Sequence, residues 1–245
     1  MDIHHIAVPY TSSTNGLAKE LIQKGKLLDT TLVTTDYQTA GKGQQTAVWE
    51  SEAGANMLAS IVLYPRNVEL SSYFLFTQLV SVAIVEVLET NTNLAFRIKW
   101  PNDIYIQNKK IAGILIETQS KGNCIENIII GIGLNINQQI FSNPTATSLA
   151  LLTGTTYQVA DMTNLVYTKI IQYYKQKLTS LESLLKLRYL HYLLGYEQEN
   201  SFLLPDNTSM KGTIKGVDTY GRLQVQTTNN ELKIYQNKEI KMVFI

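Results

Sequence analysis

The spacing of apolar residues predicts a chain that mixes helices and strands. Short apolar or β-branched runs predict strands at five places: residues 30–35, 57–64, 104–106, 111–116 and 127–137. A run of helix-capping residues precedes apolar residues spaced on one helical face, which predicts a helix over residues 14–24. Residues 71–88 are apolar almost all round, so we expect a buried helix there. Residues 161–187 carry apolar residues at steps of three to five, which predicts one long amphipathic helix.

From about Tyr196 onward the pattern changes, because turn signals recur between short alternating segments. These signals are Pro205-Asp206-Asn207, Gly216, Tyr220-Gly221 and Asn229-Asn230. Such a pattern predicts a small β-barrel. We therefore expect an α+β fold in two domains. Residues 1–195 would hold a mixed β-sheet backed by helices, and residues 196–245 would form the barrel.

The stretch over residues 97–117 places polar side chains at the ends of strongly strand-like segments. Gln107-Asn108, between two apolar runs, predicts a tight hairpin turn. Pro101 cannot donate a backbone hydrogen bond to a sheet, so it marks a strand end just before Asn102-Asp103. Polar groups held rigidly beside a glycine, here Gly113, suit a small-molecule site.

Two glycine-rich segments are further candidates. Gly41-Lys42-Gly43-Gln44 lies in a long loop over residues 36–49, where glycines let backbone N–H groups approach an anion and Lys42 adds a positive charge. Gly131-Ile132-Gly133-Leu134-Asn135 lacks the third glycine of a dinucleotide-binding motif, which excludes that class of site. It predicts either a close backbone approach to a ligand, with Asn135 as a polar contact, or a β-bulge.

Each of these segments also has an ordinary structural interpretation. The loop is equally typical of a flexible surface segment. In the hairpin, Lys109-Lys110 would only protect a sheet edge. None of these segments taken alone decides between a site and a structural role.

Composition narrows the class of protein. A hydrophobic fraction of 44% and a charged fraction of 17% are those of a globular domain. The net charge of +1 comes without a basic run, so we expect no nucleic-acid partner. Cys124 is the single cysteine, which excludes an internal disulfide and fits a reducing compartment. No apolar run approaches transmembrane length, so we expect no membrane partner and a cytoplasmic location.

Four motifs combine the candidate segments in one order along residues 5–140. They are Ser13-Thr14-Asn15; Gln38-Thr39-Ala40-Gly41-Lys42-Gly43 followed by Trp49-Glu50-Ser51; Lys99-Trp100-Pro101-Asn102-Asp103 with Lys110 and Gly113-Ile114-Leu115-Ile116-Glu117; and Gly131-Ile132-Gly133-Leu134-Asn135. In order and spacing the set resembles the biotin–protein ligase family. The resemblance implies a class II synthetase-like catalytic domain of the biotin/lipoate ligase type, and the β-rich tail resembles the family's SH3-like C-terminal domain.

The resemblance implies a reaction in two steps. Biotin attacks the α-phosphate of ATP, with Mg²⁺ as the expected metal, to give biotinyl-5′-AMP and pyrophosphate. A lysine of a biotin carboxyl carrier protein, or of the carrier domain of a biotin-dependent carboxylase, then takes the biotinyl group. The enzyme is expected to be a monomer or a homodimer.

The resemblance also implies roles for individual residues. Lys110 and Asp103 are the expected catalytic residues; Lys110 would bridge the biotin carboxylate and the α-phosphate, and Asp103 would accept a proton from the incoming lysine and hold Mg²⁺. The expected biotin contacts are Ser13, Thr14, Gln38, Gly41, Lys42, Lys110, Gly113 and Gly131. The expected contacts to ATP or the adenylate are Lys42, Gly43, Gln44, Trp49, Asn102, Asp103, Lys110 and Asn135.

The glycine-rich loop departs from the family pattern, which commonly reads Gly-Arg-Gly-Arg with a further Gly-Arg before the tryptophan. Here Lys42 and Gln44 replace two arginines and the later pair is lost. An ammonium or an amide cannot hold a phosphate in the bidentate manner of a guanidinium, so we expect weaker retention of the adenylate. The chain begins at the catalytic domain, so we expect a monofunctional ligase without an N-terminal helix-turn-helix.

Two alternative functions stay open. One is a lipoate or octanoate ligase of the same superfamily, against which the Lys99-Trp100-Pro101-Asn102-Asp103 motif and the glycine-rich loop both argue. The other is a non-catalytic biotin-sensing protein, favoured only by the altered loop.

Overall fold

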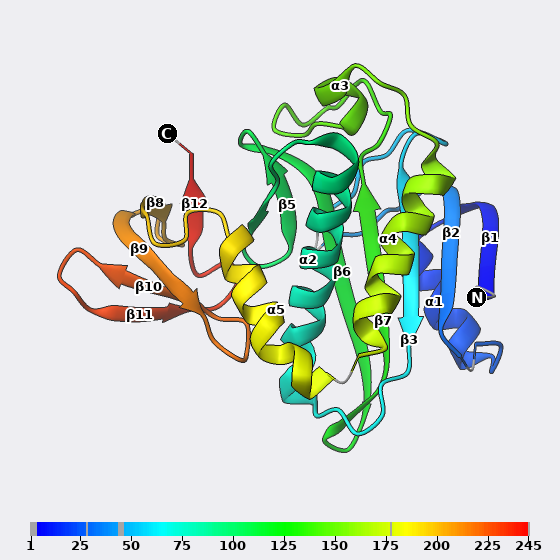
Figure 1. Ribbon diagram of the computed structural model, residues 1–245, viewed down its shortest axis with the longest axis horizontal. Helices are drawn as coiled ribbons and strands as arrows, with labels where there is room; N and C mark the ends of the chain where they lie inside the picture. The colour runs from blue at the N-terminus through cyan, green and yellow to red at the C-terminus, as the bar shows by residue number, and fades with distance from the viewer. Residues whose placement is uncertain (1–3, 28, 44–46, 177, 245) are drawn as a thin grey trace.

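The computed structural model describes residues 4–27, 29–43, 47–176 and 178–244. Within these residues, seven strands form one sheet in the order β1-β2-β3-β7-β6-β5-β4 (Figure 1). The strands are β1 (His4–Thr11), β2 (Thr31–Gln38), β3 (Met57–Leu63), β4 (Arg97–Lys99), β5 (Asp103–Ile106), β6 (Lys109–Lys121) and β7 (Cys124–Leu134). Strands β1 and β2 run parallel, and the other neighbours run antiparallel, so the predicted mixed sheet is confirmed.

Helices cover the two faces of this sheet unequally. The helices are α1 (Thr14–Gln23), the 3₁₀ turn η1 (Leu70–Ser72), α2 (Tyr73–Thr92), α3 (Leu149–Thr153), α4 (Val159–Tyr174) and α5 (Leu178–Tyr192). Helices α2, α4 and α5 lie together in front of the sheet in Figure 1, whereas α1 lies behind it. Neighbouring residues of β3 show the division, because Ile61 packs in the large core with α2 and Val62 packs in a small core with Ala18 of α1. Much of the face on the α1 side is therefore left for a site.

Helix α2 is the buried helix that the sequence predicts. Residues 70–92 are nevertheless long and apolar enough to cross a membrane, so the expectation that no segment approaches that length is wrong. The helix packs against β6 on one side and against α4 and α5 on the other, and 67% of its most apolar window is buried in protein. It is the core helix of a globular domain.

The predicted hairpin is confirmed in detail. Gln107 and Asn108 form a two-residue turn in which both have positive φ, 47° and 62°, as a type I′ turn requires. Strand β2 extends to Gln38, beyond the predicted end at residue 35. Strand β7 passes through Gly131 and Gly133 with its pairing to β3 in unbroken register, so the β-bulge interpretation is wrong.

The single long helix expected over residues 161–187 is also wrong. The chain turns after Tyr174, and α4 and α5 are separate helices. Both pack against α2, but α4 lies over β3 whereas α5 lies over β4, so one straight helix cannot follow both. The apolar face predicted for this helix included Leu165, but Leu165 is 44% exposed and the neighbouring Val166 faces the core instead.

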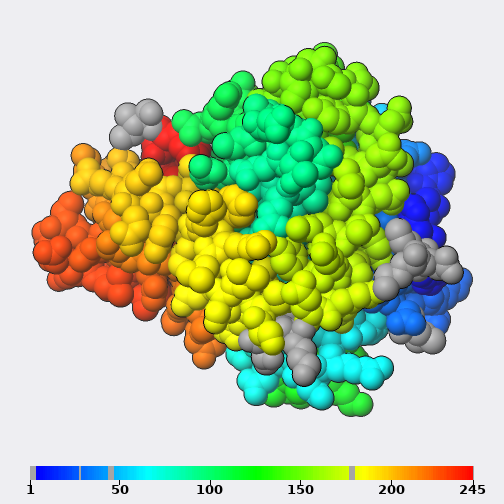
Figure 2. Space-filling view, in the orientation of Figure 1, coloured from blue at the N-terminus to red at the C-terminus, as the bar shows by residue number. Residues whose placement is uncertain are grey.

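The C-terminal segment forms a second sheet of five antiparallel strands, in the order β11-β10-β9-β8-β12. The strands are β8 (Glu199–Leu203), β9 (Ser209–Val217), β10 (Leu223–Thr227), β11 (Leu232–Tyr235) and β12 (Lys241–Val243). Figure 2 shows its orange and red surface continuous with the yellow surface of α5. Its apolar residues, Phe202 and Ile214 among them, belong to the same core as the first sheet. The SH3-like description and the boundary at residue 196 stay predictions.

One turn attaches this second sheet to the first. The indole Nε1 of Trp100 donates a hydrogen bond of 2.8 Å to the carbonyl of Gly221, in the turn between β9 and β10. Gly221 has a φ of 80°, and a Cβ there would lie 2.4 Å from the ring of Phe74 on α2. Asp218 holds the turn closed by accepting from the backbone N–H groups of Tyr220 and Arg222. The turn is a rigid contact between the two sheets.

Candidate active site

Glycines hollow the sheet on the face that carries α1. Gly113 of β6 is paired with Gly133 of β7, so two neighbouring positions carry no side chain. A Cβ on Gly133 would lie 2.3 Å from the ring of Trp49, and a Cβ on Gly131 would lie 2.5 Å from Oδ1 of Asn15. These glycines are needed because protein side chains lie directly on the backbone there. The expected contact between Gly131 and biotin stays a prediction.

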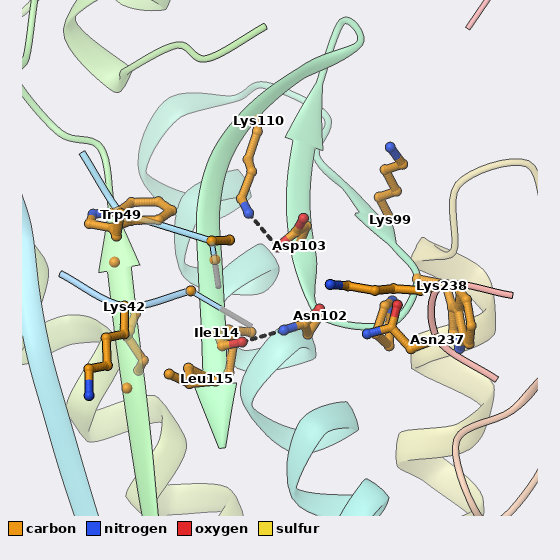
Figure 3. A pocket seen from close by; sticks show the side chains of 18 of the residues that line it. Lys42, Trp49, Lys99, Asn102, Asp103, Lys110, Ile114, Leu115, Asn237 and Lys238 are labelled. Carbon is orange, nitrogen blue, oxygen red and sulfur yellow. Dashed lines mark hydrogen bonds and ion pairs between the residues drawn. The ribbon is translucent and has the colours of Figure 1, made fainter. Parts of the chain in front are cut away.

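A cavity of about 420 Å³ opens over this face, which is the size of a small-ligand site (Figure 3). The N-terminus of α1, the glycine-rich loop, strands β6 and β7, the segment before β5 and the C-terminal sheet all contribute to its wall. It brings together most of the site residues predicted from the sequence: Ser13, Thr14, Gln38, Lys42, Gly43, Trp49, Asn102, Asp103, Lys110, Gly113 and Gly131. Residues far apart in the sequence therefore meet at one cavity.

Lys110 and Asp103 form an ion pair in this cavity. The Nζ of Lys110 lies 2.7 Å from Oδ1 of Asp103, and both side chains are 28% exposed. The bulge in the pairing of β5 with β6 lies beside them, between Ile104 and Tyr105. Figure 3 shows the two side chains pointing toward each other across the two strands. The same Nζ lies 5.6 Å from the centre of the Trp49 ring, so the indole covers the pair on one side.

Hydroxyl and amide groups gather at the other end of the cavity, around the N-terminus of α1. Ser13 caps the helix by accepting from the backbone N–H of Gly16. The backbone N–H of Thr14 donates to Oε1 of Gln38 at 2.8 Å, across to the end of β2. Both Ser13 and Thr14 are only 4% exposed. This end of the cavity offers neutral hydrogen-bonding groups, in contrast to the charged pair at Lys110.

Three of the predicted residues are placed differently. Asn102 lines the cavity, but its amide nitrogen donates to the carbonyl of Ile114, so the side chain joins β6 to the segment before β5. Asn135 is 3% exposed and lies outside the cavity, where its amide nitrogen donates to the carbonyl of Thr147 at 2.9 Å. Gly41 also lies behind the cavity wall, against the backbone of Trp49. Their expected ligand contacts stay predictions.

The two described ends of the glycine-rich loop pair with each other. The N–H of Gly43 donates to the carbonyl of Ala47 at 2.7 Å, and the N–H of Trp49 donates to the carbonyl of Gly41 at 2.9 Å. These bonds place the Trp49 ring over the bare backbone of the sheet. The predicted contact at Gln44 lies outside the described residues. Lys42 lines the cavity on the side opposite Lys238 in Figure 3.

Further cations line the cavity besides Lys42 and Lys110, and the sequence analysis missed Lys238 among them. Lys238 and Lys241 of the C-terminal sheet line the cavity together with Lys99 of β4. Burial lowers the pKa of the Lys99 ammonium, and Asp103 acts in the opposite direction. No local motif surrounds Lys238, and it reaches the site only through the folding of the C-terminal segment. The cavity therefore has a cationic end built from the first sheet and the C-terminal segment together.

This arrangement defines a class of enzyme site. One end offers hydroxyl and amide groups for a polar neutral headgroup, and the other offers several ammonium groups and one carboxylate. Such a site suits a small substrate that carries an anion at the end remote from its headgroup, together with a polyanion such as a nucleotide.

Comparison with known proteins agrees with this class of site. The sequence model of the Biotin/lipoate A/B protein ligase family matches residues 7–135. The chain is 34% identical over 240 residues to the Bifunctional ligase/repressor BirA of Bacillus spizizenii, covering 96% of this chain and 73% of that protein. It is 33% identical over 128 residues to the Biotin--[acetyl-CoA-carboxylase] ligase of Paracoccus denitrificans, covering 51% of this chain and 52% of that one.

A solved structure shares the whole fold. Biotin protein ligase from Aquifex aeolicus, in complex with biotin and ATP, has a TM-score of 0.76 and 23% sequence identity, with 98% of each chain covered. The predicted two-part α+β architecture is thereby confirmed. The chain belongs to the biotin/lipoate A/B protein ligase family.

Proposed function

We propose that this chain is a biotin–protein ligase, which activates biotin with ATP and transfers it to a lysine of a biotin carboxyl carrier protein. The observation that carries the proposal is one cavity with the Lys110–Asp103 pair at one end and Thr14 with Gln38 at the other. The names of the Bacillus and Paracoccus relatives support the activity, and the second supports a carrier that belongs to acetyl-CoA carboxylase.

The first step joins two anions. A carboxylate oxygen of biotin attacks the α-phosphorus of ATP, the bond from that phosphorus to the bridging oxygen of the β-phosphate breaks, and pyrophosphate leaves. Charge concentrates at the α-phosphate in the transition state, so preorganised cations there lower the barrier. We assign this role to Lys110, and Lys99, Lys238 and Lys241, which line the same cavity, are the further cations that we assign to the phosphates.

The second step releases AMP. The amine of the carrier lysine attacks the carbonyl carbon of biotinyl-5′-AMP, an amide bond forms, and the bond from that carbon to the phosphate oxygen breaks. The amine must lose a proton, and the carboxylate of Asp103 is the acceptor that we assign. The same carboxylate pairs with the Lys110 ammonium at 2.7 Å, so one side chain would serve both steps.

Mg²⁺ fits this site as a companion of the nucleotide. Among the described residues, no three His, Cys, Asp or Glu side chains gather as a metal site. Asp103 offers one carboxylate, and Mg²⁺ commonly takes one or two protein carboxylates together with substrate phosphates. When bound, the ion would supply positive charge to the phosphates.

The headgroup end favours biotin over lipoate. A cyclic urea carries two N–H donors and one carbonyl acceptor, whereas a dithiolane ring carries none of these. Thr14 is 4% exposed, and both Thr14 and Gln38 line the cavity. A dithiolane would offer no hydrogen-bond partner to the polar atoms of these two residues that face the cavity. The retained Lys110–Asp103 pair argues against a purely biotin-sensing role. The monomeric or dimeric state and the cytoplasmic location stay predictions.

The direct test is pyrophosphate release. With ATP, Mg²⁺ and biotin present, the purified chain should release pyrophosphate and form biotinyl-5′-AMP, and release should stop when biotin is omitted. Lipoate and octanoate in place of biotin are the comparison substrates. Pyrophosphate release that depends on lipoate and not on biotin would show that the chain is a lipoate ligase.

The altered glycine-rich loop gives a further prediction. Replacing a bidentate charge-assisted contact by a weaker one forfeits about 1–3 kcal/mol. The double change Lys42→Arg with Gln44→Arg is therefore expected to slow dissociation of biotinyl-5′-AMP by about one to two orders of magnitude. Dissociation of labelled biotinyl-5′-AMP after rapid dilution measures it, with Lys26→Arg on the remote turn after α1 as the control. An off-rate equal to that of the parent would show that other groups already hold the phosphate.

A further inference from the structure

A chain of hydrogen bonds runs from the headgroup end of the cavity, between α1 and the face of the sheet that it covers, to an exposed carboxylate. The Oγ of Ser60 lies 2.8 Å from Oγ1 of Thr14 and 2.6 Å from Oδ1 of Asn15. The amide nitrogen of Asn15 in turn donates to Oε2 of Glu117 at 2.7 Å. Ser60 is fully buried and Thr14 and Asn15 are 4% exposed, whereas Glu117 is exposed on β6. Neither Ser60 nor Glu117 lines the cavity.

The orientation of the Asn15 amide follows from its partners. Its nitrogen lies within hydrogen-bond distance of Oε2 of Glu117 and of the carbonyl of Leu115, at 2.7 and 3.3 Å. Two acceptors occupy the two N–H groups of the amide. Its oxygen must then face Ser60, and the absence of a side chain at Gly131 leaves room for it there.

Counting hydrogens assigns the direction of the remaining bonds. A serine or threonine hydroxyl has one hydrogen to donate and two lone pairs to accept with. The Oδ1 of Asn15 has no hydrogen, so at 2.6 Å the hydrogen between it and Ser60 comes from Ser60. The 2.8 Å contact between Ser60 and Thr14 must then use the hydrogen of Thr14. The Thr14 hydroxyl also lies 3.2 Å from Oε1 of Gln38, but this contact is longer, and that oxygen already accepts from the backbone N–H of Thr14 at 2.8 Å.

We propose that Ser60, Asn15 and Glu117 are positioning residues that keep the Thr14 hydroxyl turned inward, so that its oxygen faces the cavity only as an acceptor. The inference rests on the proposed function, in which a cyclic urea N–H occupies this end of the cavity. An N–H donor is complementary to an oxygen whose own hydrogen is already used. The network thus selects for a urea headgroup without touching it.

Ser60→Ala tests the buried link. Without Ser60, the Thr14 hydroxyl turns toward Gln38 or the cavity, and the Kd for biotin should rise by about tenfold. Desthiobiotin, which keeps the cyclic urea, should lose the same factor. The rate of pyrophosphate release at saturating biotin and the KM for ATP should stay within about twofold of the parent, because no group at the phosphate changes.

Ser81→Ala is the matched control for Ser60→Ala. Ser81 of α2 is also fully buried, and its Oγ has no hydrogen-bond partner among the described residues. It therefore loses an equally buried hydroxyl outside the network. Its Kd for biotin should equal that of the parent, and its melting temperature shows how much either change affects the fold.

Glu117→Ala tests the exposed end of the hydrogen-bond network, where the substitution is not expected to impair folding. Without the carboxylate, only the longer 3.3 Å bond to the carbonyl of Leu115 holds the Asn15 amide nitrogen, so the amide oxygen is held less firmly toward Ser60 and the Thr14 hydroxyl less firmly inward. The Kd for biotin should rise by about tenfold here as well. Glu117→Gln keeps an oxygen acceptor for Asn15, so it should restore the Kd to within about threefold of the parent.

The outcomes separate the two proposals. Binding of biotin by the parent, with Ser60→Ala and Glu117→Ala weakened and Glu117→Gln restored, supports the positioning role. Binding as tight as that of the parent in both alanine variants overturns it, and so does a fall in the rate at saturating biotin with the Kd unchanged. A parent that binds no biotin overturns the proposed function itself, and the positioning role with it.

Discussion

Replacing Lys110 with alanine is expected to slow the formation of biotinyl-5′-AMP by about two to three orders of magnitude. Its ammonium is held 2.7 Å from Asp103 and beside the Trp49 ring, so the protein itself preorganises this charge. A preorganised charge needs no reorientation during the reaction, which is why its loss affects the rate strongly. The variant should fold, because the side chain is 28% exposed and lines the cavity.

Lys109→Ala is the matched control, since Lys109 is the preceding residue on the same strand and is exposed to solvent. Pyrophosphate release measured over time, with biotin and ATP saturating, gives the comparison. Lys109→Ala should retain the rate of the parent. Near-normal synthesis of biotinyl-5′-AMP by Lys110→Ala would remove this lysine from the mechanism.

Replacing Gly221 with alanine is expected to raise the KM for ATP, or lower the rate, by about ten- to a hundredfold while leaving biotin binding nearly unchanged. The added methyl group would meet the Phe74 ring at 2.4 Å, so the turn must move away from α2. Movement there also breaks the bond to Trp100 and shifts the sheet that carries Lys238 and Lys241. The headgroup end lies on the other sheet and is not involved.

Gly122→Ala separates this displacement from simple backbone strain. Gly122 also has a positive φ, 62°, but a Cβ there meets nothing within 4 Å. Both variants therefore carry the left-handed strain of a non-glycine residue, and only Gly221→Ala adds the collision. KM values for ATP and Kd values for biotin, measured for both, decide the matter. Equal behaviour of the two variants would mean that the turn does not position the nucleotide end.

The elements that the sequence predicted well are those determined by neighbouring residues. The turn at Gln107-Asn108 and the cap at Ser13 follow from backbone and side-chain preferences within a few positions. The break between α4 and α5 has no such local cause, because it follows from where β3 and β4 lie beneath them. Helical periodicity carries no information about that path.

The site residues divide in the same way, into those that a sequence motif predicts and those that only the fold brings together. Lys110 and Asp103 were predicted from a resemblance, and the structure brings them into contact. Ser60 was missed because it is one hydroxyl in an apolar strand, and only the fold places it beside Thr14 and Asn15. A pattern of residue types cannot show which donor faces which acceptor 45 residues away.

The amides show a different limit. The resemblance to the family implies that Asn102 contacts the ligand, but its amide nitrogen donates to the carbonyl of Ile114 and joins two parts of the sheet. The same residue in a motif can contact the ligand itself, or it can support the segment that contacts the ligand. Only the hydrogen-bond partners distinguish these uses.

The positions of the two tryptophans have a practical consequence for studying this chain in solution. The Trp49 ring lies on the cavity floor with its Nε1 unpaired among the described residues, so its emission should change when a ligand enters. Trp100 is instead bonded to the turn that joins the sheets, so its emission should follow their docking. Trp49→Phe and Trp100→Phe variants would leave one emitter each. The chain thus carries two native optical probes, one at the cavity and one at the contact between the sheets, and requires no attached label.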